Sequence, residues 1–198
     1  MCSDPLSLHL PMPEWAAAYQ AALPESLPDV EQRMRIVLEL ASLNFERNTG
    51  GPFAAGVFER GTGRLVALGV NRVVASGCSS AHAEVMALGL AQKRLGTYDL
   101  GGPEQPEHEL VVNWRPCAMC YGAVLWSGVR HLTIAGSGSE LEELTGFDEG
   151  PVHPEWKAQL AARGIETHEG VLRAEAVDLF RRFKASARIV YNPRQGAE

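Results

Sequence analysis

His82-Ala83-Glu84 and, further along the chain, Pro116-Cys117-Ala118-Met119-Cys120 are the stretches of sequence that decide the fold. Together they supply one imidazole, two thiols and a carboxylate beside the imidazole. In catalytic zinc sites three protein ligands leave the fourth tetrahedral position open for water, whereas structural sites are closed. That water gives up a proton near neutral pH, and the neighbouring carboxylate can carry it. The predicted Zn²⁺ ligands are His82, Cys117 and Cys120, and the predicted acid and base is Glu84.

A structural zinc site is the main alternative for these residues. A lone C-x-x-C is common and also occurs in redox pairs and in half of a zinc finger. A structural site needs a fourth Cys or His at ligand spacing, and the sequence offers only Cys78 close to His82. We expect Cys78 to be a small buried or pocket-edge residue, which favours the catalytic interpretation.

The composition of the 198-residue chain is that of an ordinary globular protein, with 45% hydrophobic and 21% charged residues. Four cysteines, two of them assigned to zinc, leave no disulfide framework, which is typical of the reducing cytoplasm. No apolar run approaches the ~20 residues that span a bilayer, and no signal-peptide pattern is present. The formal charge of −6 argues against a nucleic-acid partner, because phosphate binding relies on clustered Lys and Arg. We therefore expect a cytoplasmic protein without a membrane partner.

An N-terminal arm precedes the predicted domain. Residues 1–28 contain five prolines and one short helical candidate, at residues 14–23. This composition is typical of an arm that wraps over a core. The single domain is predicted at residues 29–198 and begins with a helix at residues 29–45, for which Asp29 is a good N-cap.

Apolar runs on either side of a glycine-containing turn predict a β-hairpin at residues 53–70. The two segments with the zinc ligands then read as buried helices at residues 81–95 and 117–126. Ser80 is the expected N-cap of the first helix, and Gly128 is expected to end the second.

Strands and helices alternate in the second half of the chain. Strands are predicted at residues 109–113, 130–135 and 165–167, and helices at residues 154–162 and 173–184. This order predicts a three-layer α/β/α sandwich around a mixed sheet of about five strands. Both zinc segments then lie where a helix begins, and the partial positive charge of a helix N-terminus stabilises thiolates.

The pattern H-x-E followed by P-C-x-x-C is the signature of zinc nucleobase deaminases, and the chain matches it position by position. From about Gly50 to its end, the chain resembles the guanine-deaminase branch of the cytidine-deaminase-like superfamily, in particular small bacterial enzymes that also turn over the triazine ammeline. The matching segments are Gly51-Pro52-Phe53-Ala54-Ala55, Asn71-Arg72-Val73-Val74, Ser80-Ala81-His82-Ala83-Glu84, Trp126-Ser127-Gly128-Val129-Arg130 and Gly146-Phe147-Asp148-Glu149-Gly150-Pro151. The resemblance implies a zinc-dependent hydrolytic deaminase that converts guanine to xanthine and ammonia.

The resemblance also implies roles for residues outside the zinc motif. Phe53 packs on the base, Asn71 hydrogen-bonds its polar edge, and Glu149 is a second acid and base. The other residues expected to contact the substrate are Asn113, Trp114, Asp148 and Tyr191. The family fold exchanges C-terminal segments in a homodimer, so residues 189–192 are expected to close the partner's pocket.

Each of these assignments has a purely structural alternative. Phe53 is otherwise a core strand residue, and Asn71 a turn former at a strand end. Residues 147–150 are otherwise a surface turn, and residues 189–191 an edge strand of their own chain.

The chain departs from the resembled family just before the second zinc segment. The family usually reads Ser-x-Glu-Pro-Cys, whereas this chain has Asn113-Trp114-Arg115-Pro116-Cys117. Trp114 can stack on a base or narrow the pocket. Arg115 can pair near Glu84, with the acidic residues 148–149, or with solvent. The departure leaves the reaction intact and opens the question of substrate.

Three other functions therefore stay open. The first is a deaminase of guanosine, cytidine or another purine, pyrimidine or triazine. The second is a tRNA adenosine deaminase, which would use the basic residues Arg181, Arg182, Lys184 and Arg188. The third is a non-catalytic, zinc-stabilised dimer. The net acidity and the Phe-Asp-Glu-Gly segment favour a small-molecule substrate.

Overall fold

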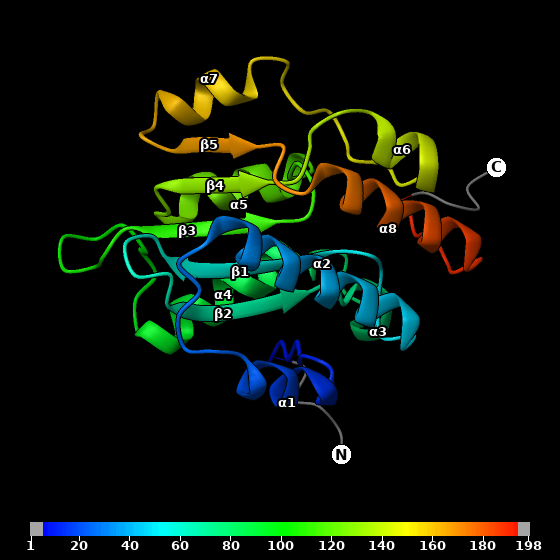
Figure 1. Ribbon diagram of the computed structural model, residues 1–198, viewed down its shortest axis with the longest axis horizontal. Coiled ribbons are helices and arrows are strands. Elements are labelled where there is room, and N and C mark those ends of the chain that lie inside the picture. Colours follow the sequence, from blue (N-terminus) through cyan, green and yellow to red (C-terminus); the bar gives the residue numbers. More distant parts are fainter. Residues whose placement is uncertain (1–5, 194–198) are drawn as a thin grey trace.

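A mixed five-stranded sheet forms the centre of the molecule (Figure 1). The structure is a computed structural model that describes residues 6–193; residues 1–5 of the predicted arm and residues 194–198 lie outside the described part. The strand order is β2-β1-β3-β4-β5. The predicted α/β/α sandwich is confirmed.

The predicted hairpin forms one side of the sheet. β1 (Ala54–Glu59) pairs with β2 (Leu65–Val70) in antiparallel register, Ala54 opposite Val70. β2 is buried along its whole length, because helices cover both faces of the sheet. Gly69 lets the first zinc helix approach closely, since a Cβ there would collide with the backbone of Ala83 and Ala87.

Three strands continue the sheet beyond β1. β3 (His108–Val112) runs antiparallel to β1, and β4 (His131–Ile134) and β5 (Glu166–Glu169) follow it in parallel. Parallel neighbours need a crossover connection. Here α5 (Ala118–Ser127) connects β3 to β4, and α7 (Trp156–Ala161) precedes β5.

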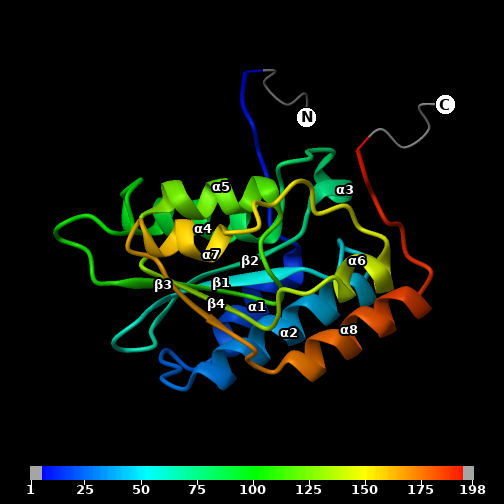
Figure 2. The same cartoon turned by 90° about the horizontal axis from the view of Figure 1, so that it is seen from above.

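The helices form one layer on each face of the sheet (Figure 2). α4 (Ala83–Leu95), α5 and α7 cover one face, and their core includes Ala87, Val124 and Trp156. The other layer contains α1 (Glu14–Ala22), α2 (Val30–Glu46) and α8 (Arg173–Ala185). No helix within residues 6–193 is long and apolar enough to cross a membrane.

Some helix boundaries differ from the sequence-based expectation. Asp29 caps α2 as predicted, and its carboxylate accepts from the backbone N–H of Glu31 at 2.6 Å. The N-cap of α4 is His82, so the prediction of Ser80 is wrong. α3 (Val73–Ser76) and α6 (Glu140–Thr145) were not expected, because one or two turns are too short to show a helical apolar period.

The described part of the arm lies on the domain. The Trp15 indole N–H donates to the Thr49 hydroxyl at 3.2 Å, and Arg72 Nε donates to the Pro11 carbonyl at 3.0 Å. These contacts connect α1 to the segment after α2, and the chain just before α1 to the segment after β2.

A buried ion pair joins α2 to the sheet. Arg33 Nε lies 2.9 Å from Glu109 Oε2 on β3, and neither side chain is more than 2% exposed. Arg33 also donates to the carbonyls of Leu27 and Pro28, and Thr133 donates to the Glu109 carboxylate at 2.6 Å.

Candidate active site

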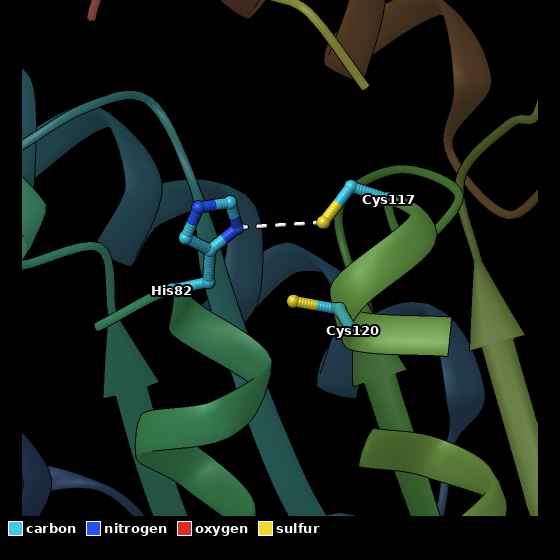
Figure 3. A group of neighbouring side chains, drawn as sticks. All are labelled: His82, Cys117 and Cys120. Carbon is cyan, nitrogen blue, oxygen red and sulfur yellow. Dashed lines mark hydrogen bonds between the residues drawn. The ribbon is translucent and has the colours of Figure 1, made fainter. Parts of the chain in front are cut away.

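The three predicted zinc ligands lie together where α4 and α5 begin (Figure 3). His82 and Cys117 are the N-caps of these two helices, and Cys120 lies one turn into α5. His82 Nδ1 is 3.5 Å from Cys117 Sγ, and the three ligand atoms lie within 4.8 Å of one another. The prediction that these residues form one site is confirmed.

This cluster fits a zinc ion. Ligands at about 2.0–2.3 Å in a tetrahedron lie about 3.3–3.8 Å apart, which agrees with the 3.5 Å separation of Nδ1 and Sγ. Among the described residues, Cys78 is not part of this cluster, and its thiol contacts the Ser80 hydroxyl at 3.2 Å. The site therefore has three protein ligands, as the catalytic interpretation requires.

The cluster favours a thiolate at Cys117. The hydrogen bond with Cys120 is the main cause that lowers the pKa of the Cys117 thiol to about 4, against the effect of burial. Burial disfavours a charged His82 imidazole, but the hydrogen bond with Cys117 and the nearby Glu84 outweigh it and raise the pKa of His82. A thiolate is the form of cysteine that binds metal.

Glu84 and Glu149, the two residues predicted to transfer protons, share the cavity with the cluster. Glu84 lies in the first turn of α4 and is 7% exposed. Glu149 follows α6, and its carbonyl accepts from the backbone N–H of Ala118 at 2.9 Å, which connects its loop to the beginning of α5. Burial is the main cause that raises the pKa of Glu149 to about 9, with negative charge on Cys117 and Glu84 adding to it. Burial likewise raises the pKa of Glu84.

The cavity has a volume of about 670 Å³, which is within the range of small-molecule sites. Nearly all the site residues predicted from the sequence line this cavity. The predicted residues that line it are Phe53, His82, Glu84, Asn113, Trp114, Cys117, Asp148, Glu149 and Tyr191.

Aromatic rings make one wall of the cavity. Phe53, directly before β1, meets Phe147 edge-on with ring centroids 5.1 Å apart. Phe147 in turn meets Tyr191 at 5.3 Å. Such a wall matches the flat apolar faces of a heteroaromatic ring.

Asn71 differs from the other predicted substrate contacts because it does not line the cavity. It is 1% exposed, and its side-chain amide donates to the Tyr191 hydroxyl. In this structure Tyr191 therefore lies between Asn71 and the cavity. A direct contact of Asn71 with the base stays a prediction.

The C-terminal segment lines the cavity of its own chain. Asn192 accepts from the Asp148 N–H and donates to the Gly146 carbonyl, both at 2.9 Å. The segment is not a strand, so the alternative of an edge strand is wrong. Its exchange between two chains stays a prediction.

The polar groups of Asn113 and Asp148 are engaged with backbone. Asn113 Oδ1 accepts from the Ala54 N–H, and its Nδ2 donates to the Pro52 carbonyl, both at 3.0 Å. The Asp148 carboxylate accepts from the Gly150 N–H at 2.8 Å. Asn113 thus fixes the backbone on both sides of Phe53.

Trp114 forms a rigid part of the wall. It is 1% exposed, and its indole N–H donates to the Gly138 carbonyl at 3.1 Å. The Arg173 guanidinium lies 5.1 Å from its ring centre. Gly136 leaves room for this stack, since a Cβ there would lie 2.6 Å from the Trp114 ring.

Arg115 has a partner that the sequence analysis did not consider. Its Nη2 lies 3.2 Å from Glu142 Oε1, on α6. Arg115 therefore forms its ion pair with Glu142 and not with Glu84, Asp148 or Glu149, although its positive charge still acts on Glu149 and lowers the pKa of that carboxyl.

Several cavity residues were missed by sequence reasoning. They are Val73, Ser79, Met119 and Pro193. Most are small or apolar residues with no chemical signal of their own. Asn192 was expected to close the partner's pocket, and in this structure it lines the cavity of its own chain.

Comparisons with known proteins agree with this site. Residues 28–135 match the family model described as the zinc-binding region of cytidine and deoxycytidylate deaminases. The guanine deaminase of Bacillus subtilis (strain 168) is 32% identical over 142 residues, which are 72% of this chain and 86% of that protein.

Solved structures extend the likeness over most of the chain. A guanine deaminase from Nitrosomonas europaea is 46% identical with a TM-score of 0.86, covering 90% of this chain and 97% of its own. A mutant of NE0047 in complex with 8-azaguanine is also 46% identical with a TM-score of 0.86, covering 91% of this chain and 98% of its own.

Proposed function

The chain belongs to the cytidine and deoxycytidylate deaminase zinc-binding family, and we propose that this zinc-dependent deaminase converts free guanine and water to xanthine and ammonia. The observation that carries the proposal is the likeness to a guanine deaminase at 46% identity over 90% of the chain.

The cavity supports a planar base as the substrate. Phe53 would pack on the base, and Trp114 would limit the depth of the cavity, because it is held from behind by Gly138 and Arg173. Asn113 and Asn71 would act mainly by holding Phe53 and Tyr191 in place. Asp148 and Tyr191 also line the cavity, and the second carboxylate oxygen of Asp148 and the hydroxyl hydrogen of Tyr191 would meet the polar edge of the base.

The two carboxyl groups would divide the proton transfers. When bound, zinc supplies a Lewis acid that activates a water molecule. Glu84, next to the ligand His82, would accept the proton that water loses and deliver it to a ring nitrogen. Glu149, whose pKa burial raises to about 9, would donate a proton to the exocyclic amine that leaves as ammonia.

A homodimer is part of the proposal. α5 presents apolar side chains to solvent, with Met119 40% and Trp126 88% exposed, and a second copy of the chain would cover them. Exchange of residues 189–192 would first have to break the contacts of Tyr191 and Asn192 with their own chain. A cytoplasmic location also stays a proposal.

A nucleic-acid substrate receives less support. Of the basic residues near the C-terminus, Arg182 is paired with Glu46 at 2.7 Å and with Asp178 at 3.4 Å. These pairs neutralise charge that would otherwise face a phosphate backbone.

Ammonia release tests the substrate. The purified protein should be assayed with guanine, guanosine, cytosine, cytidine, adenine, ammeline and an adenosine-34 tRNA at equal concentration. We expect guanine to be preferred, and Cys117→Ala to lose both zinc and activity. Preference for a nucleoside or tRNA by about tenfold, or about 1.4 kcal/mol of transition-state free energy, would overturn the assignment of guanine.

A further inference from the structure

α6 connects Arg115 to the loop that carries Glu149. The ion pair between Arg115 and Glu142 attaches the middle of this helix to the segment just before the zinc ligand Cys117. The backbone of Arg115 is itself fixed, because its N–H donates to the Gly136 carbonyl at 2.8 Å. The Arg115 side chain is 13% exposed and that of Glu142 is 34% exposed, so the pair is shielded from water on the arginine side and partly open on the glutamate side.

The end of α6 transmits this attachment to the loop. The Gly146 N–H donates to the carbonyl of Glu142 at 2.8 Å, and Gly146 has a left-handed backbone with φ +80°. The Thr145 hydroxyl donates to the Leu141 carbonyl at 2.6 Å and accepts from the Phe147 N–H at 3.3 Å. Glu142 therefore has two roles: its side chain pairs with Arg115, and its carbonyl accepts the hydrogen bond that ends α6, where the Glu149 loop begins.

The loop is held at its other end as well. Ala118 binds the carbonyl of Glu149 at 2.9 Å. With both ends fixed, the Glu149 side chain has a restricted position in the cavity. Displacing a proton-transfer group by about 1 Å can cost about 10²-fold in rate, so this restriction matters for catalysis.

We propose that Arg115, held by Glu142, is a positioning residue that fixes the Glu149 loop against the zinc end of α5. The proposal rests on the proposed function, in which Glu149 transfers a proton. Arg115 also lines the cavity, but its Nη2 is paired with Glu142 and its Nε is buried, which favours a positioning role over a direct contact with the substrate. Arg115, which stands where the resembled family has Glu, thus holds the loop that carries Glu149.

The test compares four single variants by kcat and KM for guanine, at equal zinc content. Arg115→Met and Glu142→Gln remove either side of the pair, and Arg115→Lys restores the charge. Glu143→Gln is the matched control, because Glu143 is the next residue of the same helix, is exposed, and its carboxylate accepts from the Ser139 hydroxyl on the same side of α6 rather than from Arg115. We expect kcat to fall by about 10-fold or more in Arg115→Met and Glu142→Gln with KM changed less than about threefold, a smaller loss in Arg115→Lys, and none in Glu143→Gln.

Two double variants show whether the effect passes through Glu142 to Glu149. Arg115→Met with Glu142→Gln should be no slower than Arg115→Met alone, and Arg115→Met should have no further effect on Glu149→Gln, because residues that act as a unit are not additive. Unchanged kcat in both single variants, a change confined to KM, or full additivity with Glu149→Gln would overturn the proposal. If Arg115→Met loses zinc, Glu142→Gln alone decides, since Glu142 is distant in sequence from the ligands.

These outcomes separate the two proposals. A wild-type protein that releases no ammonia from guanine refutes the proposed substrate. The same variants are then compared with whichever substrate of the panel is turned over, and the positioning role is judged on that reaction.

Discussion

The buried pair of Arg33 and Glu109 predicts a large and specific loss of stability. Arg33→Met removes the cation and leaves the Glu109 carboxylate at most 2% exposed, with Thr133 as its remaining partner. Breaking a buried ion pair costs about 3–5 kcal/mol, because one charge stays buried without its partner. The carbonyls of Leu27 and Pro28 also lose their donor, so we expect the upper part of that range.

Urea denaturation of the zinc-loaded protein measures this loss. A protein of this size should lose about 2–4 °C of Tm per kcal/mol, so Arg33→Met should also melt roughly 8–20 °C lower. Arg35→Met is the matched control on the same helix. Its pair with Glu31 is 3.7 Å long and about 60% exposed on both sides, and exposed pairs contribute about 0–1 kcal/mol.

A compensating variant shows whether the unpaired charge is the cause. Arg33→Met with Glu109→Gln removes both charges and should recover much of the stability that the single change loses. The reasoning would be refuted if Arg33→Met lost no more than Arg35→Met. It would equally be refuted if the double variant were less stable than Arg33→Met alone.

Three further predictions address the site and the surface. Glu84→Gln should keep zinc and the folded state but lose about 10²–10⁴-fold in ammonia release; full activity with normal zinc content would show that another group moves the proton. Tyr191→Phe removes the hydroxyl that Asn71 binds. It should raise KM for guanine and leave Tm nearly unchanged; a lower Tm with unchanged KM would show that Tyr191 has a purely structural role. The Arg64 guanidinium is the main cause that lowers the pKa of Glu59 below its ordinary 4.5. The wild type should therefore be more stable than Glu59→Gln by about 0.2–1 kcal/mol above about pH 4.5 and should lose that advantage as the pH falls further. A difference in unfolding free energy that stays constant down to pH 3 would contradict this prediction.

The sequence was sufficient where chemistry or periodicity is local. Ligand type and spacing identify His82, Cys117 and Cys120 as a metal site. Apolar periodicity predicts the hairpin and the long helices. Their predicted sandwich and zinc cluster are the ones found. These features depend on few residues at fixed separations, so one chain carries enough information.

Pairings across long separations were beyond this reasoning. Asn71 meets Tyr191 across 120 residues, and Arg115 meets Glu142 across 27. Nothing local distinguishes Glu142 from its acidic neighbours on α6. Such partners are chosen by how the elements pack, which single-sequence patterns do not encode.

Gly136 makes the side chains allowed at three positions of the cavity wall, 114, 136 and 173, depend on one another. A side chain there would overlap both the Trp114 ring and the Arg173 guanidinium. A tryptophan packed at 114 as in this structure requires a glycine at 136, whereas a smaller residue at 114 would leave room for a side chain there. We expect positions 114, 136 and 173 to vary together among relatives, and attempts to widen the cavity at one of them to succeed only when the others are redesigned with it.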